Sequence, residues 1–124
     1  MSAYPAVKIE GAKLSENTYQ HGDKVWVVAN LIEHAKGLEP FDLPLAAVHA
    51  GTEVWTPVTS AYGLAQQMRR VLDVNPDYPV ILDEEGFIMD GWHRIARALV
   101  DSKATIKAVR FPQTPPHDYL KDPQ

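Results

Sequence analysis

The stretch Val80–Leu99, VILDEEGFIMDGWHRIARAL, decides the fold, because two apolar segments around an acidic turn run directly into a helical pattern. The two segments, Pro79–Asp83 and Phe87–Met89, are predicted strands. A short connection with glycine at its end, Glu84-Glu85-Gly86, is typical of a β-hairpin. The sequence therefore predicts a hairpin whose second strand leads into a helix.

That helix is predicted to begin at Gly91 and to end at about Asp101. Its expected buried face consists of apolar residues at helical spacing, namely Ile95, Ala98 and Leu99. The first N–H groups of a helix have no intrahelical acceptor, and the helix dipole adds about half a positive charge there. Because glycine lets the backbone approach an anion closely, the sequence predicts a phosphate-binding site at Gly91.

Three basic residues near Gly91 are candidate phosphate ligands. His93 and Arg94 add side-chain donors in the first turn, and an arginine can grip a phosphate with two parallel hydrogen bonds. Arg97 lies one turn beyond His93 and can supply a third cationic group. Gly91, His93, Arg94 and Arg97 therefore form the core of the predicted binding site.

Two further residues at this helix start, Asp90 and Trp92, have more than one expected role. Asp90 either caps the helix, binds the magnesium ion of a nucleotide, orients His93 or acts as a general base. Asp90 and His93 are thus the candidate catalytic residues, and Asp90 is the candidate metal ligand. Trp92 either packs in the core or belongs to the nucleotide-binding surface.

The N-terminal part of the chain contains weaker signals. Ala6–Glu10 is a candidate short strand, and Lys24–Val28 is a predicted strand rich in β-forming residues. A helix is predicted over residues 30–36, capped by Asn30 and ended by Gly37.

The middle of the chain contains a second apolar stretch and a clear amphipathic helix. Leu43–Val48 is a strand or a turn, and Pro44 favours an edge position if it is a strand. A helix is predicted over Ser60–Val74, capped by Thr59 or Ser60. Its apolar stripe, expected to face the core, consists of Ala61, Leu64, Ala65, Met68, Val71 and Leu72. Its expected outward face carries Gln66, Gln67, Arg69 and Arg70.

Length and composition favour one domain over residues 1–111. Its last predicted strand is Thr105–Phe111. Residues 112–124 form a Pro-rich tail that we expect to be extended or disordered. The chain has 124 residues and no cysteine, which excludes disulfides, thiolate catalysis and zinc bound by cysteine. No apolar run reaches the roughly 20 residues of a membrane span, and the N-terminus lacks the features of a signal peptide. We therefore expect a cytoplasmic protein without membrane contact, and no haem.

The segment Phe87–Arg97, FIMDGWHRIAR, resembles the core motif of the ParB/sulfiredoxin-like superfamily, in a stand-alone, single-domain form. With the segments around it, the resemblance extends over about Leu43–Phe111. It implies an α/β (α+β) fold with a mixed sheet and a hairpin leading into the motif helix. It also implies that Gly91, His93 and Arg94 bind nucleotide phosphates, with Mg²⁺ and ATP, ADP or CTP as the expected cofactors.

Departures from the family narrow this expectation. Sulfiredoxins carry their catalytic cysteine where this chain has Trp92, so the sulfinic-acid reductase reaction is excluded. The loop His49–Thr59 replaces the family's early polar loop, and His49 and Trp55 are candidates for the opposite wall of the pocket. Two acidic residues, Glu53 and Asp83, are further candidate carboxylates for a metal or for base catalysis.

Three functions remain open at this point. The first is a nucleotide- or phosphate-binding enzyme, either a small phosphotransferase or a nucleotide hydrolase. The second is a ligand-binding or protein-interaction module without turnover. The third is a nuclease or DNA-binding protein, which the net charge of −4 and the lack of a basic track oppose. The expected partner is a nucleotide or another phosphorylated small molecule rather than nucleic acid, and a second copy of the chain is a further candidate.

Overall fold

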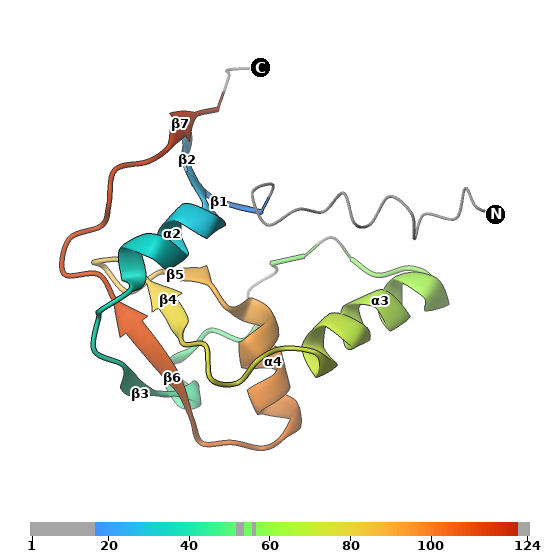
Figure 1. Cartoon of the computed structure of the whole chain (residues 1–124). Helices are drawn as coiled ribbons and strands as arrows, with labels where there is room; N and C mark the ends of the chain where they lie inside the picture. Colours follow the sequence, from blue (N-terminus) through green and yellow to red (C-terminus); the bar gives the residue numbers. More distant parts are fainter. Residues whose placement is uncertain (1–16, 52–53, 56, 122–124) are drawn as a thin grey trace.

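The computed structural model describes residues 17–51, 54–55 and 57–121, which form an α+β fold (Figure 1). The strands are β1 (Thr18–His21), β2 (Lys24–Val27), β3 (Phe41–Pro44), β4 (Val80–Leu82), β5 (Ile88–Asp90), β6 (Thr105–Arg110) and β7 (Tyr119–Leu120). The helices are α2 (Val28–Ala35), the 3₁₀ helix η2 (Leu45–Ala47), α3 (Ala61–Leu72) and α4 (Trp92–Val100). Within these described ranges, no helix has both the length and the apolar character needed to cross a membrane.

The strands form two sheets, of which the larger is mixed. Its strand order is β3-β6-β4-β5, with β6 antiparallel to β3 and parallel to β4. β4 and β5 pair antiparallel, which confirms the predicted hairpin. The segment Leu43–Val48 is the end of β3 followed by η2, and Pro44 does lie on an edge strand. The smaller sheet is antiparallel, with the order β1-β2-β7.

The turn between β4 and β5 is held by a side chain. Asp83 Oδ1 accepts hydrogen bonds from the backbone N–H groups of Glu85 (2.9 Å) and Phe87 (2.8 Å). Gly86 has a φ of +93°, a conformation that favours glycine. Asp83, a candidate carboxylate for a metal or base, is thus a buried turn residue.

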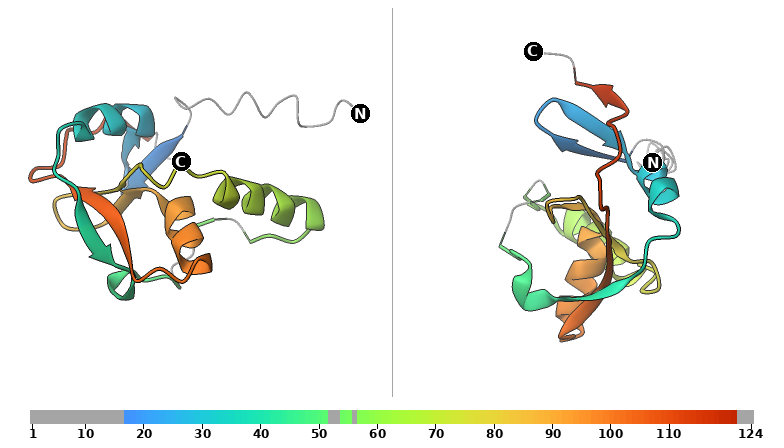
Figure 2. Two further views of the ribbon diagram at one scale, coloured as in Figure 1. Left: turned by 60° about the horizontal axis from the view of Figure 1, so that its bottom comes forward. Right: turned by 90° about the vertical axis from the view of Figure 1, so that its left-hand side faces the viewer.

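The core lies on both faces of the larger sheet, because successive residues of β4 point to opposite sides. Ile81 packs with Leu31 of α2, whereas Val80 and Leu82 pack with Ile95 of α4. α2 and α4 accordingly cover opposite faces (Figure 2). The predicted burial of Ile95 and Ala98 is confirmed, but that of Leu99 is wrong, since its side chain is 47% exposed.

The predicted strand and helix near Lys24 are confirmed as β2 and α2, but the predicted cap is wrong. α2 begins two residues earlier than expected, after Val27, and Asn30 lies inside its first turn. At the start of α2 the hydrogen-bond acceptor is instead the carboxylate of Asp118, which is distant in the sequence. It accepts hydrogen bonds from Val27 N (2.6 Å) and from Asn30 Nδ2 (3.0 Å). Gly37, with a φ of +90°, follows the helix end as predicted.

The described part of the Pro-rich tail, up to Lys121, is extended and bonded along β2. β7 pairs with β2, and Trp26 Nε1 donates a 2.8 Å hydrogen bond to the carbonyl of Pro115. The backbone N–H of Lys121 donates to the carbonyl of Asp23. The tail therefore holds the smaller sheet and the start of α2 together. The candidate strand Ala6–Glu10 lies outside the described residues.

α3 begins as predicted but does not pack as predicted. The hydroxyl of Ser60 accepts a 3.0 Å hydrogen bond from Gly63 N, which confirms the cap. None of the residues of α3 is buried, however, and the side chains of its apolar stripe are about half exposed: Leu64 51%, Met68 53% and Leu72 56%. The expectation that this stripe faces the core is wrong.

The position of α3 explains this exposure. α2 and α4 already cover the two faces of the larger sheet, and α3 projects sideways from α4 (Figure 2). Its less exposed residues, Gly63, Gln67 and Val71, are spaced four apart and form one face. Gln67 bonds to α4, so this mixed face, which shares Val71 with the apolar stripe, contacts the body of the protein.

Candidate functional site

The start of α4 is built around Gly91, which occupies the N-cap position with a φ of +118°. A Cβ at Gly91 would lie 3.0 to 3.2 Å from atoms of Val80, including its backbone Cα. Glycine is therefore required for the backbone conformation and for the close approach of α4 to β4. Among the described residues no side chain caps α4 or accepts from its first N–H groups, so the alternative that Asp90 caps the helix is wrong.

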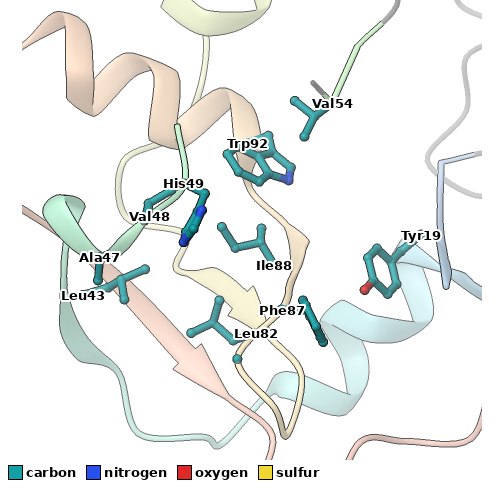
Figure 3. A pocket seen from close by; sticks show the side chains of 11 residues that line it. Tyr19, Leu43, Ala47, Val48, His49, Val54, Leu82, Phe87, Ile88 and Trp92 are labelled. Carbon is teal, nitrogen blue, oxygen red and sulfur yellow. The ribbon is translucent and has the colours of Figure 1, made fainter. Parts of the chain in front are cut away.

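A pocket of about 470 Å³ opens beside this helix start. Trp92, His49 and Ile88 gather at one end of it, and Phe87 and Tyr19 lie at the other (Figure 3). The remaining lining residues are Leu43, Ala47, Val48, Val54, Leu82 and Gly86. Trp92 and His49 line the same cavity, and the expectation that His49 belongs to the wall of a ligand site opposite the helix start stays a prediction.

The side chain of His93 contacts α3 and is not among the residues that line this pocket. A 2.9 Å hydrogen bond joins its Nε2 to Oε1 of Gln67, and its ring packs on Trp55 with centroids 4.7 Å apart. Burial first, and then the positive charge of Arg70, lowers the pKa of His93. His93 and Trp55 thus contact each other, and Trp55, a candidate for the opposite wall of the pocket, is not among its described lining residues.

Arg94 and Asp90 form an ion pair with each other. Nη2 of Arg94 lies 2.9 Å from Oδ2 of Asp90 and donates a second, 3.2 Å hydrogen bond to the carbonyl of Pro79. Both side chains are mostly buried, with 16% and 25% exposure, and Nε of Arg94 has no hydrogen-bond partner within the described part of the chain. The pair ties the end of β5 to the first turn of α4, and it neutralises most of the charge that Arg94 would offer to an anion.

Arg97 lies at the contact between the two helices. Its Nε donates to Oδ2 of Asp101 and its Nη1 to the carbonyl of Leu72, both at 2.9 Å. The second bond satisfies a carbonyl at the end of α3. Arg97 therefore holds α3 against α4, and its role as a phosphate ligand stays a prediction.

Some residues of the site were missed in the sequence. Gln67 was assigned to an outward face, although it is the partner of His93. Tyr19 comes from β1, whose polar sequence TYQH gives little sign of a strand apart from a single aromatic residue among polar ones. Glu53 lies outside the described residues. In the part of the chain that the structure describes, no three His, Asp or Glu side chains are grouped closely enough to hold a metal ion.

The predicted residues therefore form three groups: Trp92 with His49 at the pocket, His93 with Trp55, and the Asp90–Arg94 pair between the end of β5 and the first turn of α4. The pocket and the uncapped end of α4 meet at Trp92, which is the first helical residue and a lining residue at once. Comparison of the chain with protein-family models, curated proteins and solved structures finds no match.

Proposed function

We propose that this protein binds a phosphorylated small molecule, such as a nucleotide, with the phosphate at the start of α4 and the organic part in the pocket beside Trp92. The observation that carries the proposal is the shared position of Trp92, which begins an uncapped helix and lines a cavity of about 470 Å³. A cavity of this size is within the range that small-molecule sites occupy. The resemblance of FIMDGWHRIAR to the ParB/sulfiredoxin-like motif supports the same place for the phosphate.

Charge near the helix start favours an anion. The side chain of Arg70 is exposed, and among the described residues it has no hydrogen-bond or ion-pair partner. Its charge is near enough to lower the pKa of His93, which is the second residue of α4. Arg70 and the helix dipole together provide the positive potential at this end of α4.

The contacts of the candidate catalytic residues favour binding without turnover. Asp90 is bonded to Arg94, so its carboxylate is engaged in holding β5 to α4. Nε2 of His93 is bonded to Gln67, and its ring is covered on one side by Trp55. Neither group faces the pocket, and we therefore propose a binding protein, in a cytoplasmic setting, rather than a phosphotransferase, hydrolase or nuclease.

Thermal shift and calorimetry with phosphorylated compounds test the proposal. Nucleoside mono-, di- and triphosphates are added with and without Mg²⁺, and the unphosphorylated nucleosides serve as controls. A ligand at about 100 times its Kd stabilises the folded protein by about 2.7 kcal/mol, so at least one phosphorylated compound should raise the Tm clearly. If the compounds and the bare nucleosides have the same effect, the proposal is wrong.

Two neighbouring arginines provide a matched pair of variants. Arg70→Ala should weaken the binding of the phosphorylated compound severalfold, because it removes a charge near the start of α4. Arg69→Ala, on the adjacent exposed position of α3, should change the Kd little. Equal effects of both variants would show that the phosphate does not lie near His93 and Arg70.

The second candidate function, a protein-interaction module, is favoured by α3. Its stripe of half-exposed apolar side chains, Leu64, Met68 and Leu72, is the kind of surface that binds protein partners. Under this alternative, no phosphorylated compound shifts the Tm, and Leu64→Gln with Met68→Gln changes the oligomeric state or the solubility of the chain. Analytical ultracentrifugation of the double variant beside the parent measures that change.

A further inference from the structure

The end of the tail, residues 114–121, is bound to the body of the protein by specific polar contacts, and we call it the C-terminal arm. Thr114 and Glu84 of the hairpin turn exchange two hydrogen bonds, from Glu84 N to Oγ1 of Thr114 (2.9 Å) and from Thr114 N to Oε1 of Glu84 (2.8 Å). At the start of α2, the carboxylate of Asp118 accepts a 2.6 Å hydrogen bond from Val27 N. The body therefore recognises both side chains and backbone of the arm.

Trp26 of β2 contacts the arm between these two places. Its Nε1 donates a 2.8 Å hydrogen bond to the carbonyl of Pro115, and its ring meets that of His117 edge-on, with centroids 6.2 Å apart. Further along, β7 pairs with β2, and Lys24 lies opposite Leu120. Because prolines restrict the free chain, an arm that contains them loses less entropy when it docks. The hairpin turn, β2 and the start of α2 thus form a docking site for an extended peptide, and its occupant here is the arm of the same chain.

The arm is joined to the body by a connection with few contacts of its own. Pro112 and Gln113 are exposed, and neither has a hydrogen-bond partner in the part of the chain that the structure describes. None of the residues 112–121 is fully buried, and the side chains of Tyr119 and Leu120 are 49% and 54% exposed. Release of the arm therefore exposes little apolar surface, and an identical arm restores every contact that is lost.

We propose that the arm is exchangeable: the docking site of one chain also accepts the arm of a second copy, and two copies form a dimer with crossed arms. A second copy fits because its arm brings Thr114, Pro115 and Asp118 to the same partners, and only the connection at residues 112–113 has to change. The exchange is reciprocal, so the dimer is closed and leaves no site empty. This surface is independent of a ligand at the start of α4.

Single cysteines test the exchange directly, because the chain has no cysteine of its own. Lys24 and Leu120 lie opposite each other in β2 and β7, where two cysteines can form a disulfide. A full chain with Lys24→Cys is mixed with one carrying Leu120→Cys in a glutathione redox buffer, and mass spectrometry measures the disulfide-linked heterodimer. Tyr119→Cys is the matched control for Leu120→Cys, because neighbouring strand residues point to opposite faces. The mixture with Leu120→Cys should give severalfold more heterodimer.

Both substitutions in one chain lock the arm in place. Lys24→Cys with Leu120→Cys, oxidised at low protein concentration, should form an intramolecular disulfide and then stay monomeric. The parent should show a monomer–dimer equilibrium in analytical ultracentrifugation between about 10 µM and about 1 mM, since the tethered arm competes at an effective concentration in the mM range. Reduction of the double variant should restore the behaviour of the parent.

A synthetic peptide of residues 112–121 tests the recognition of the arm. An excess of this peptide should lower the yield of the heterodimer, because it occupies the same docking site. The same peptide with Asp118→Ala should compete about tenfold less well, which is the effect of losing a hydrogen bond to a charged group.

The opposite results would overturn the proposal. If the parent stays monomeric up to about 1 mM, arms are not exchanged, and a peptide that still binds would assign the site to a segment of another protein. If the oxidised double variant dimerises like the parent, the dimer forms through another surface, such as the exposed stripe of α3. Equal heterodimer yields with Leu120→Cys and Tyr119→Cys would show that the second arm does not pair with β2.

Discussion

α3 and α4 are both amphipathic helices with apolar residues at helical spacing, yet they occupy different environments. α4 buries Ile95 and Ala98 against β4 and β6, and Ile95 is 1% exposed. α3 buries none of its residues, and Met68 in the middle of its stripe is 53% exposed. The helices also start differently, because α3 is capped by the hydroxyl of Ser60, whereas the N-cap of α4 is Gly91 and no described side chain caps it.

The difference shows that an apolar stripe in the sequence indicates which side chains a helix is able to bury. It does not show whether those side chains are buried in the fold. α4 follows β5 closely in the chain, so its apolar stripe packs on a face of the sheet to which β5 belongs. α3 is joined to the body through polar contacts, Gln67 with His93 and the carbonyl of Leu72 with Arg97. The helix that carries the candidate site is thus packed on the sheet, and α3 is a peripheral element beside it.

The largest difference in the free energy of unfolding should appear when one apolar side chain is shortened in each helix. Ile95→Ala on α4 leaves a cavity in a fully packed core and should lower the free energy of unfolding by about 2–5 kcal/mol. Met68→Ala on α3 removes a side chain that is already half exposed and should change it by less than about 1 kcal/mol. Urea unfolding followed by circular dichroism measures both. Equal losses in the two variants would mean that α3 is packed in solution.

A second test concerns the start of α4. Gly91→Ala forces a Cβ into a φ of +118° and within 3.0 to 3.2 Å of Val80 atoms, so we expect a loss of about 2–4 kcal/mol. Gly86→Ala is the control, because its φ is +93° but a Cβ there meets nothing within 4 Å, and strain alone should cost about 1–2 kcal/mol. A cost at Gly91 no larger than at Gly86 would contradict the close approach of α4 to β4.

The start of α3 should be less sensitive. Ser60→Ala removes the acceptor of Gly63 N and should lower the free energy of unfolding by about 1 kcal/mol, the usual value of an N-cap. Ser60→Asn keeps an acceptor and should retain most of the stability. Equilibrium unfolding of the three proteins measures the difference. A Ser60→Ala variant as stable as the parent would show that the end of α3 is frayed.

The smallest effect is a pH dependence at the contact between the helices. The pKa of His93 is lowered by burial and by Arg70, so the unfolded chain takes up a proton at a higher pH than the folded protein does. This contribution to stability is complete above about pH 6.5 and is lost as the pH falls below it. His93→Gln should remove this part of the pH dependence between pH 5 and 8 in urea unfolding, whereas His34→Gln, at an exposed position of α2, should keep it. A slope unchanged by His93→Gln would place His93 in solvent.

Local sequence signals predicted much of the fold around the site. The hairpin, its glycine turn and the helix that follows are encoded within Val80–Leu99, where each element is next to its partner. The cap at Ser60 is likewise a short-range pattern. The Asp90–Arg94 ion pair could also have been predicted, since the two are four positions apart, but the sequence analysis gave Arg94 to a phosphate and did not weigh Arg94 as the partner of Asp90.

Long-range contacts could not be predicted in the same way. The carboxylate at the start of α2 comes from Asp118, 91 positions from Val27, and no local pattern predicts that bond. The exposure of Leu64, Met68 and Leu72 depends on which helices already cover the sheet. The pocket joins Tyr19 of β1 to Trp92 of α4, so its walls become visible only when the strands are assembled.

The most direct test of the central claim is an NMR titration of the ¹⁵N-labelled full chain with AMP. The proposed site predicts saturable shifts of the backbone amides of Trp92 and His93 and of the Trp92 indole N–H, because these groups lie at the start of α4 and in the pocket. The amides of Leu64 and Met68 on the exposed stripe of α3 should not move. Saturable shifts confined to α3, or no saturable shift at Trp92, would contradict the account.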